Sequence, residues 1–408
     1  MELKKYKLGD LVEVTRGMSL SGQFYSETGT LIRLTLGNFN MNGGGFKENT
    51  SKTDLYFTGP VKEEYILQEG DIITPLTEQS LGLLGTTAKI PESGKYIQSQ
   101  DVALVKYKEG LIDPNFCYYL ISSNLVRQQL SAAAQQTKIR HTSPDKIKDC
   151  TVWVPDLENQ KKIGRILADI DSKITLNCQI NDNLEAMAKQ LYDYWFVQFD
   201  FPNEEGKPYK SSGGKMVWND KLKREIPEGW EVKTIGTFAD VKRGSTITKA
   251  QTVEGDIKVV AAATDYSFLH NEANRSAYVI TVSASGANAG FINFWREPIY
   301  ASDCSTIQCE KIEETLYCYY WILHFQELLF TQQIGAAQPH VYPEHINKIP
   351  IVVPSPDILA KVKNLLVKSN QKQSEISREI ESLTKQRDEL LPLLMNGQVS
   401  VNYHLSHD

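Results

Sequence analysis

The sequence lacks the features that mark membrane, secreted and metal-binding proteins. None of its 408 residues belongs to an apolar run near the roughly 18 residues that cross a bilayer. The opening MELKKYKLGD has no apolar stretch behind its lysines, so it does not indicate a signal peptide. The six cysteines include no Cys-x-x-Cys pair, which argues against zinc and predicts free, partly buried thiols. We therefore expect a cytoplasmic protein without a metal site.

Catalytic and nucleotide-binding motifs are missing as well. No GxxxxGK[ST] phosphate loop occurs, and Gly43-Gly44-Gly45 lacks the GxGxxG spacing. Adenine methyltransferases hold a flipped base with an Asn/Asp-Pro-Pro-aromatic loop. Asp113-Pro114-Asn115-Phe116 lacks the second proline and is more typical of a helix cap. His340 and His345 have no acidic or cysteine partners, so we interpret them as contact or structural residues. We expect no catalysis and no bound cofactor in this chain.

The composition indicates a globular protein of more than one domain. Hydrophobic residues make up 41% and charged residues 23% of the chain, and its length exceeds that of one ordinary core. The net charge of −6 argues against a protein that coats nucleic acid non-specifically. It leaves room for a local basic surface, because only the contact face must be positive.

The chain carries one plan twice. SPDKIKDCTVWVP (143–155) returns as YPEHINKIPIVVP (342–354), 199 residues later (342 − 143 = 199). We call these two segments the twin frames. KLGDLVEVTRG (7–17) is echoed by TIGTFADVKRG (234–244), which predicts in each half a strand that ends at an Arg-Gly turn. CYYL and CYYW open helix-like segments in the two halves. The segments between these landmarks differ, which favours a common scaffold with different surfaces.

A long helix is predicted after each repeated frame. One begins near Asp156, a good N-cap, and the other at Ser355-Pro356, where proline suits the first turn. Alternating steps of four and three residues follow coiled-coil seams in both helices. The residues expected to pack are Ile163, Leu167, Ile170, Ile174, Asn177, Asn181, Leu184, Leu191, Val362, Leu366, Ile376, Ile380, Leu383 and Leu390.

We expect the two helices to pack antiparallel, with facing residue numbers that sum to 557. This register places no two strongly polar side chains opposite each other, and Asn177 and Asn181 could fix it by hydrogen bonding. The alternative is that each helix packs only on its own domain. A dense aromatic run after the first helix, LYDYWFVQFDFP (191–202), is expected to pack down rather than form a flexible tether.

At this point the sequence resembles the DNA-specificity subunits of type I restriction–modification systems. The segments YDYWFVQFDFP, GKPYKSSGGKM, REIPEGWEV and ITVSASGANAGFINFWREPIYASDC carry the resemblance, together with the twin frames, in the family's order. The implied fold class is α+β, with two mixed α/β target-recognition domains joined by two long antiparallel coiled-coil helices in pseudo-two-fold symmetry. The expected domains are 1–155 (first recognition domain), 156–200 (central helical spacer), 201–229 (linker), 230–354 (second recognition domain) and 355–408 (C-terminal helical spacer).

The resemblance implies a non-catalytic reader of double-stranded DNA. Each recognition domain would read half of a split sequence. The helices, roughly 50 Å long at ~1.5 Å per residue, would set the unread gap. Two adenine-N6 methyltransferase subunits and two ATP-dependent translocase–nuclease subunits would be the partners, and they would use S-adenosylmethionine, ATP and Mg. A stand-alone methyltransferase or nuclease, or a coiled-coil bridging protein, are the alternatives.

Candidate DNA contacts rest on local chemistry, since the resemblance carries over no base-reading residue. Gln pairs with adenine, Arg with guanine, and Lys or His with phosphate. A solvated loop would have a similar composition, Arg16 and Arg243 could instead form structural ion pairs, and a hairpin turn explains Ser285 and Asn288 equally well. The candidates are Arg16, Gln135, Gln136, Lys138, Arg140, His141, Arg243, Lys249, Ser285, Asn288, Gln338, His340 and Tyr342.

Overall fold

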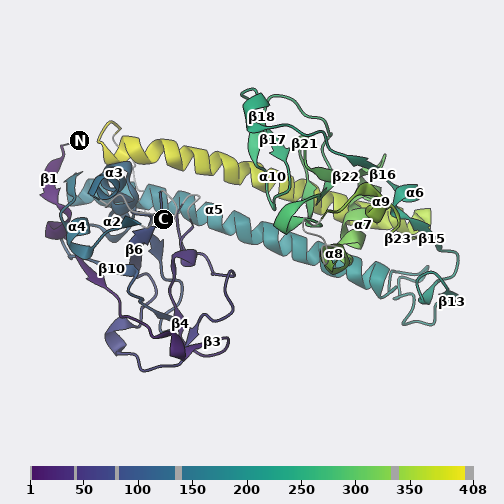
Figure 1. The fold of residues 1–408 in the computed structure, drawn as a ribbon, viewed down its shortest axis with the longest axis horizontal. Helices are drawn as coiled ribbons and strands as arrows, with labels where there is room; N and C mark the ends of the chain where they lie inside the picture. The colour runs from purple at the N-terminus through teal and green to yellow at the C-terminus, as the bar shows by residue number, and fades with distance from the viewer. Residues whose placement is uncertain (1, 41–43, 79–81, 134–139, 332–339, 400–408) are drawn as a thin grey trace. The chain divides into compact units, whose positions relative to one another are not determined.

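The computed structural model describes residues 2–40, 44–78, 82–133, 140–331 and 340–399. The chain divides into two compact units, the first formed by residues 1–176 with 379–408 and the second by residues 177–378. Each unit contains a head of strands and short helices and part of each of two long helices (Figure 1). Among the described residues, every helix is too short or too polar to span a bilayer.

The head of the first unit, called the first head, is built on an antiparallel sheet in the order β2-β10-β6-β8. A second sheet, β3-β5-β4-β9, contains the parallel pair β4–β9, and β1 pairs with β12. The elements are β1 (Lys4–Lys7), α1 (Leu8–Leu11), β2 (Val12–Arg16), β3 (Tyr25–Ser26), β4 (Ile32–Arg33), β5 (Tyr56–Phe57), β6 (Ile72–Pro75), β7 (Thr77–Glu78), β8 (Ala88–Lys89), β9 (Tyr96–Ile97), β10 (Val102–Tyr107), α2 (Pro114–Ser122), α3 (Asn124–Ala133), β11 (Arg140–His141), α4 (Pro144–Lys148) and β12 (Thr151–Val154).

The second head repeats the main features of this plan, although its smaller sheet, β18-β17-β21, has three strands instead of four. Its main sheet runs β16-β22-β19-β20, the pair β17–β21 is parallel, and β15 pairs with β23. The elements of the second unit are β13 (Met216–Asn219), β14 (Arg224–Pro227), β15 (Glu231–Thr234), α6 (Ile235–Phe238), β16 (Asp240–Arg243), β17 (Ile257–Val260), β18 (Phe268–His270), β19 (Val279–Ser283), β20 (Ile292–Trp295), β21 (Ile299–Ala301), β22 (Cys304–Gln308), α7 (Ile312–Leu323), α8 (Gln326–Thr331), α9 (Pro343–Asn347) and β23 (Pro350–Val353). The internal repeat predicted from the sequence is therefore confirmed.

The twin frames form a short helix followed by a strand in both heads. The helices α4 and α9 each begin with a proline, and the hydroxyl of Ser143 accepts the N–H of Lys146 to cap α4. A Cβ added at Gly9 of α1 would lie 2.9 Å from Cβ of Lys148. The equivalent Cβ at Gly236 of α6 would lie 2.6 Å from Oδ1 of Asn347. Glycine thus lets α1 lie against α4, and α6 against α9, so the frame and the opening segment of each half recur together.

The repeated Arg-Gly pairs also have a steric reason. A side chain at Gly17 would overlap the carbonyl oxygens of Gln98 and Ser99, and one at Gly244 would overlap the carbonyl oxygen of Ser302. Both glycines lie at the end of the first strand of the main sheet, where the neighbouring backbone crosses closely. Close approach, rather than an unusual φ angle, requires glycine at these two positions.

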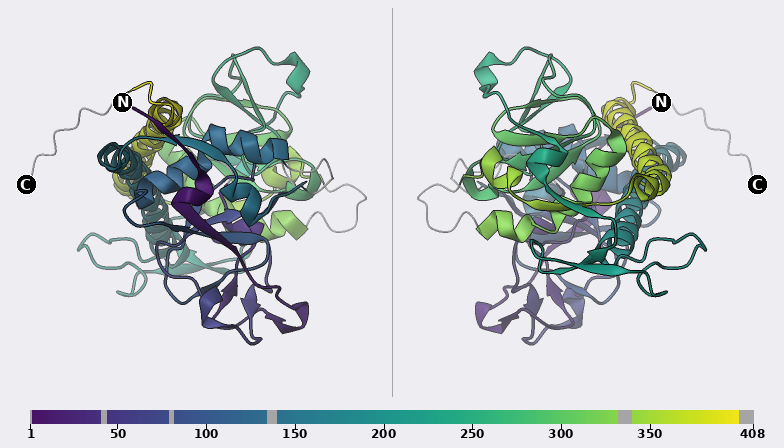
Figure 2. Two further views of the ribbon diagram at one scale, coloured as in Figure 1. Left: turned by 90° about the vertical axis from the view of Figure 1, so that its left-hand side faces the viewer. Right: turned by 90° about the vertical axis from the view of Figure 1, so that its right-hand side faces the viewer.

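The two long helices are α5 (Leu157–Tyr192), which continues as a π-helical turn over Asp193–Val197, and α10 (Pro356–Met395). Asp156 caps α5, because its Oδ1 accepts the N–H of Asn159 at 3.0 Å. Within each unit the parts of α5 and α10 lie side by side (Figures 1 and 2).

The helices run antiparallel within each unit. In the first unit Arg387 Nη1 lies 3.0 Å from Asp171 Oδ1, and in the second Asn181 Nδ2 donates to Ser377 Oγ at 3.2 Å. Both pairs sum to 558 (171 + 387 and 181 + 377), one more than the expected 557. The residues expected to pack are all buried or half-buried, and none is exposed. Their individual partners across the seam stay a prediction.

The aromatic run packs into the core of the second unit. Phe196, Phe199 and Phe201 are buried beside Trp230, and the rings of Phe201 and Trp230 stack at 4.9 Å. The segment predicted as a linker, 201–229, contains the hairpin β13–β14. In the first unit, Ile163 and Leu167 of α5 join a core that includes Leu394 and Met395 of α10. The predicted domain boundaries stay a prediction.

Candidate nucleic-acid interface

In the second head, three candidate residues that are far apart in the sequence meet at one end of the main sheet. Ser285 and His340 form an antiparallel bridge, and Val341 N–H donates to Ala284 O at 2.9 Å. Arg243, at the end of β16, forms an ion pair with Asp303 in which Nη2 lies 2.7 Å from Oδ1. The other carboxylate oxygen of Asp303 accepts the Ser285 hydroxyl in a short hydrogen bond. We call Arg243, Ser285, Asp303 and His340 the second edge.

Asp303 was not among the predicted residues, although the repeat contains a signal for it. Ala284 N–H donates to Asp303 O at 3.2 Å, and in the first head Leu76 N–H donates to Asp101 O at 2.8 Å. The two aspartates therefore hold equivalent places. Aligning the strands that begin at Val102 and Cys304 would have identified both.

The second edge carries further cationic and aromatic surface. Arg275 donates from Nη2 to the carbonyl oxygen of Arg243 at 3.1 Å and from Nε to Thr306 Oγ1 at 2.8 Å. The rings of His340 and Tyr342 lie 5.8 Å apart and nearly parallel, and Tyr342 is 47% exposed. Guanidinium groups and exposed aromatic rings are the groups with which proteins contact phosphates and bases.

The first head has the equivalent bridge with different chemistry. Thr142 N–H donates to Leu76 O at 2.8 Å, and β11 pairs with β7 so that Arg140 faces Glu78 and His141 faces Thr77. Arg140 Nη1 lies 3.2 Å from Glu78 Oε1. His141 is exposed. We call Glu78, Arg140 and His141 the first edge.

The remaining candidates are placed as follows. Arg16 is exposed at the end of β2, opposite Ala103, and no ion pair joins it to another described residue, unlike its counterpart Arg243. Asn288 closes a 3-10 turn, Gly286–Asn288, between β19 and β20, as the hairpin alternative predicted. Lys249 is exposed in the turn Lys249–Gln251. Gln135, Gln136, Lys138 and Gln338 lie outside the described residues. DNA contact by any of these residues stays a prediction.

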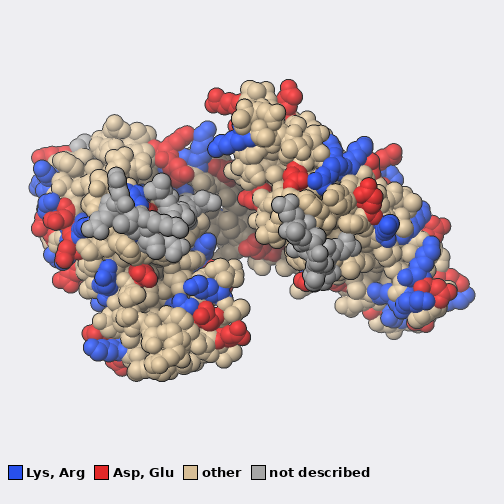
Figure 3. Space-filling model, viewed as in Figure 1, with Lys and Arg blue, Asp and Glu red and all other residues tan. Residues whose placement is uncertain are grey.

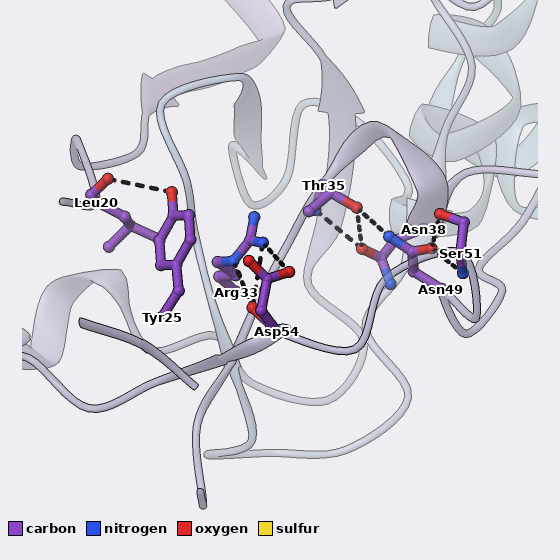
Figure 4. Close-up of polar contacts among 8 residues, drawn as sticks. All are labelled: Leu20, Tyr25, Arg33, Thr35, Asn38, Asn49, Ser51 and Asp54. Carbon is purple, nitrogen blue, oxygen red and sulfur yellow. Dashed lines mark hydrogen bonds and ion pairs between the residues drawn. The ribbon is translucent and has the colours of Figure 1, made fainter. Parts of the chain in front are cut away.

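The smaller sheet of the first head, β3-β5-β4-β9, and the residues beside it carry a polar cluster that was not predicted from the sequence (Figure 4). The guanidinium of Arg33 lies 3.8 Å from the centre of the Tyr25 ring and pairs with Asp54 at 3.1 Å. Asn49 Nδ2 donates to Thr35 Oγ1 at 2.8 Å. These contacts hold residues 47–54 against β4 and the residues that follow it. Nothing in the local sequence distinguishes this cluster from an ordinary solvated loop.

The described surface has mixed charge (Figure 3), and the first unit contains a polar cavity. Figure 3 shows Lys and Arg in small groups mixed with Asp and Glu on the face drawn. No group of three or more His, Cys, Asp and Glu residues arranged to hold a metal occurs among the described residues. Asp113 caps α2, since its Oδ1 accepts the N–H of Phe116 at 3.0 Å, as predicted for this Asp-Pro pair. A cavity of about 600 Å³ in the first unit is lined by polar residues that include Arg127, Asp171 and Arg387.

Known proteins resemble this chain along most of its length. The specificity subunit of the type I restriction enzyme MjaIX from Methanocaldococcus jannaschii is 25% identical over 319 residues, which cover 72% of this chain and 71% of the relative. The HindI specificity subunit from Haemophilus influenzae is 22% identical over 378 residues, with 74% and 81% covered. The crystal structure of a type I restriction–modification S subunit from M. genitalium aligns with a TM-score of 0.61 at 17% identity, covering 97% and 96% of the two chains.

The family comparison covers both heads and most of the two long helices. Residues 1–186 and 227–391 match the type I restriction modification DNA specificity domain. Two matched segments agree with the repeat in the fold, and the likeness to the M. genitalium subunit supports the same fold. The chain therefore belongs to the family of type I restriction–modification specificity subunits, the non-catalytic DNA-recognition components of these systems.

Proposed function

We propose that this chain reads a bipartite DNA sequence, with each head contacting one half-site through its edge. The observation that carries the proposal is the pair of equivalent bridges, β7–β11 in the first head and Ser285–His340 in the second. The scaffold is the same, whereas the side chains differ. Two copies of one scaffold with different contact residues suit two different half-sites, in the way that a dimer suits a palindrome.

The proposal includes the partners. The chain recruits two adenine-N6 methyltransferase subunits for modification and two ATP-dependent translocase–nuclease subunits for restriction, and it works on cytoplasmic DNA. S-adenosylmethionine, ATP and Mg are used by those partners, while this chain binds no cofactor. The support is the family match together with the absence of phosphate-loop and methyltransferase motifs from the sequence.

Mapping of DNA methylation tests this function. The chain is expressed with its methyltransferase partner in a host that lacks other adenine methylation, and N6-methyladenine is located by long-read sequencing. We expect a split motif that disappears when the gene for this chain is omitted. A gel shift with a duplex carrying that motif should then require both proteins. An unchanged methylation pattern without this chain would contradict the proposal.

A further inference from the structure

A buried carboxylate ties together the segments that form the first edge. The side chain of Glu78 is 2% exposed. Its Oε2 accepts the backbone N–H groups of Gly82, Leu83 and Leu84 at 3.1, 3.0 and 3.0 Å. A buried carboxylate is stable only when hydrogen bonds compensate it, and these three N–H groups supply that compensation to Oε2. Glu78 therefore fixes the backbone of residues 82–84.

Arg140 extends this connection to α3. Its Nη1 pairs with Oε1 of Glu78 at 3.2 Å, and its Nη2 donates to the carbonyl oxygen of Ser131, near the end of α3, at 2.6 Å. The arginine side chain is only 20% exposed. Both ends of the guanidinium fork are thus bonded to protein, so little of it remains to form a bidentate contact with a base.

The second head fixes its edge by another route. Ser285 stands at the bridge position of Thr77, and its hydroxyl is bound by Asp303, which comes from the turn before β22. Asp303 holds Arg243, whose side chain is 38% exposed. The arginine held in the second head therefore remains more open to a ligand than Arg140 does.

We propose that Glu78, acting through Arg140, is the positioning residue of the first edge, and that Arg140 orients the neighbouring segments instead of reading a base itself. This inference rests on the proposed function. Because the pair joins β7, residues 82–84, β11 and α3, its loss should loosen the reading of one whole half-site. A direct base contact would affect one base pair only.

Methylation motifs of four variants test the positioning role. Glu78→Gln, Arg140→Gln and the double variant are compared with Glu92→Gln, a matched substitution of an exposed glutamate in the same head. The whole chain is expressed with its methyltransferase partner, and the motif is mapped as above. We expect both single variants to make several positions of the same half-site degenerate. The double variant should match the singles, because residues that act as one unit are not additive, and Glu92→Gln should keep the wild-type motif.

The outcomes separate this inference from the proposed function. No split motif from the wild-type chain would contradict the function itself. A wild-type motif that Glu78→Gln leaves unchanged would overturn the positioning role, as would an effect of Arg140→Gln confined to one base pair. Degeneracy at positions in both half-sites would also count against it.

A variant that fails to fold is recognised by its urea unfolding curve. Arg140→Lys then provides the milder change, because lysine keeps the charge beside Glu78 but lacks the fork that reaches Ser131 as well. We expect Arg140→Lys to affect the same half-site as Arg140→Gln, to a smaller extent. If Arg140→Lys and a stably folded Arg140→Gln both gave the wild-type motif, the inference would be overturned.

Discussion

The hydroxyl of Tyr119 in the first head donates a hydrogen bond of 2.6 Å to Oδ2 of Asp171 on α5. The residue 199 positions later, Asn370 (171 + 199 = 370), accepts a hydrogen bond of 2.8 Å from Nε of Arg296 in the second head. Each head is therefore attached to a long helix at the same place in the repeat. The chemistry differs, because an acid is bound by a phenol in one unit and an amide by an arginine in the other.

Asp171→Leu should destabilise the first unit. The carboxylate of Asp171 binds both Tyr119 and Arg387, and the arginine side chain is only 9% exposed. Removal of the carboxylate leaves the Tyr119 hydroxyl and the Arg387 guanidinium with one partner fewer. We expect this loss to lower the free energy of unfolding by about 3 kcal/mol. Urea unfolding measures the change. Asp169→Leu, at an exposed position on the same helix, is the control, and an equal loss in both variants would contradict the prediction.

Gly17→Ala should disturb the first head because the new methyl group would overlap two carbonyl oxygens. We expect the free energy of unfolding to fall by roughly 2 kcal/mol or more, since the neighbours are backbone atoms that cannot rotate away. Gly22→Ala is the control, as its Cβ would lie 3.9 Å from the nearest atom. Thermal unfolding compares them, and similar midpoints for the two variants would argue against the steric explanation.

Stability should fall at alkaline pH. Burial raises the pKa of the Cys117 and Cys304 thiols from 9.0 to about 12, and it raises the pKa of Tyr118 from 10.0 to about 12. At a pH between the unfolded and the folded pKa of a group, the unfolded chain has lost a proton that the folded chain retains. The stability that the two thiols contribute is therefore complete below about pH 9, and that of Tyr118 below about pH 10. Above that pH each contribution is lost by ~1.4 kcal/mol per pH unit. Urea unfolding at pH 8, 9.5 and 10.5 checks this, and a flat profile would contradict it.

Cys178 should be the thiol that reagents modify first. It is the exposed member of the six, whereas Cys117, Cys150, Cys304 and Cys318 are buried and Cys309 is intermediate. Reaction requires the thiolate and access, and burial opposes both. Labelling with a maleimide at pH 7.5, followed by peptide mass spectrometry, should find Cys178 at early times. Cys178→Ser should remove the fast phase, and a fast phase that persists would show another accessible thiol.

Shortening both long helices tests the proposed spacer. Removal of seven residues from each of α5 and α10 keeps the coiled-coil phase and shortens each helix by about 10 Å at ~1.5 Å per residue. We expect the gap in the methylated motif to shrink by roughly 3 base pairs, at ~3.4 Å per pair. The half-site sequences should stay the same. An unchanged gap would rule out a ruler made by the helices.

Much of the fold could be predicted because it repeats. The twin frames, the CYYL and CYYW helices and the two long helices each have local signals, such as the prolines at Pro144 and Pro343 and the cap at Asp156. The first part of each frame, residues 144–148 and 343–347, forms a short helix that the sequence did not reveal. A stretch of five residues carries too little periodicity to distinguish a helix from a turn.

The edges were less predictable because tertiary contacts assemble them. Arg243, Ser285 and His340 were proposed separately. The bridge of residue 285 with residue 340 and the contacts of Asp303 bring them together. Glu78 and Asp303 were missed, since a single acid in a strand or turn is usually solvated. Their importance comes from the N–H groups, hydroxyl and guanidinium groups that surround them, and no local spacing shows these partners.

The strand pairs β1–β12 and β15–β23 have a consequence for how such a protein can change. Lys4 lies opposite Val154, and Glu231 lies opposite Val353, so the chain enters and leaves each head side by side. Neighbouring strands are about 5 Å apart, whatever lies between them in the sequence. The interior of a head can therefore vary in sequence and length while its two ends stay paired, so that specificity can change without a change in how the chain enters and leaves the head.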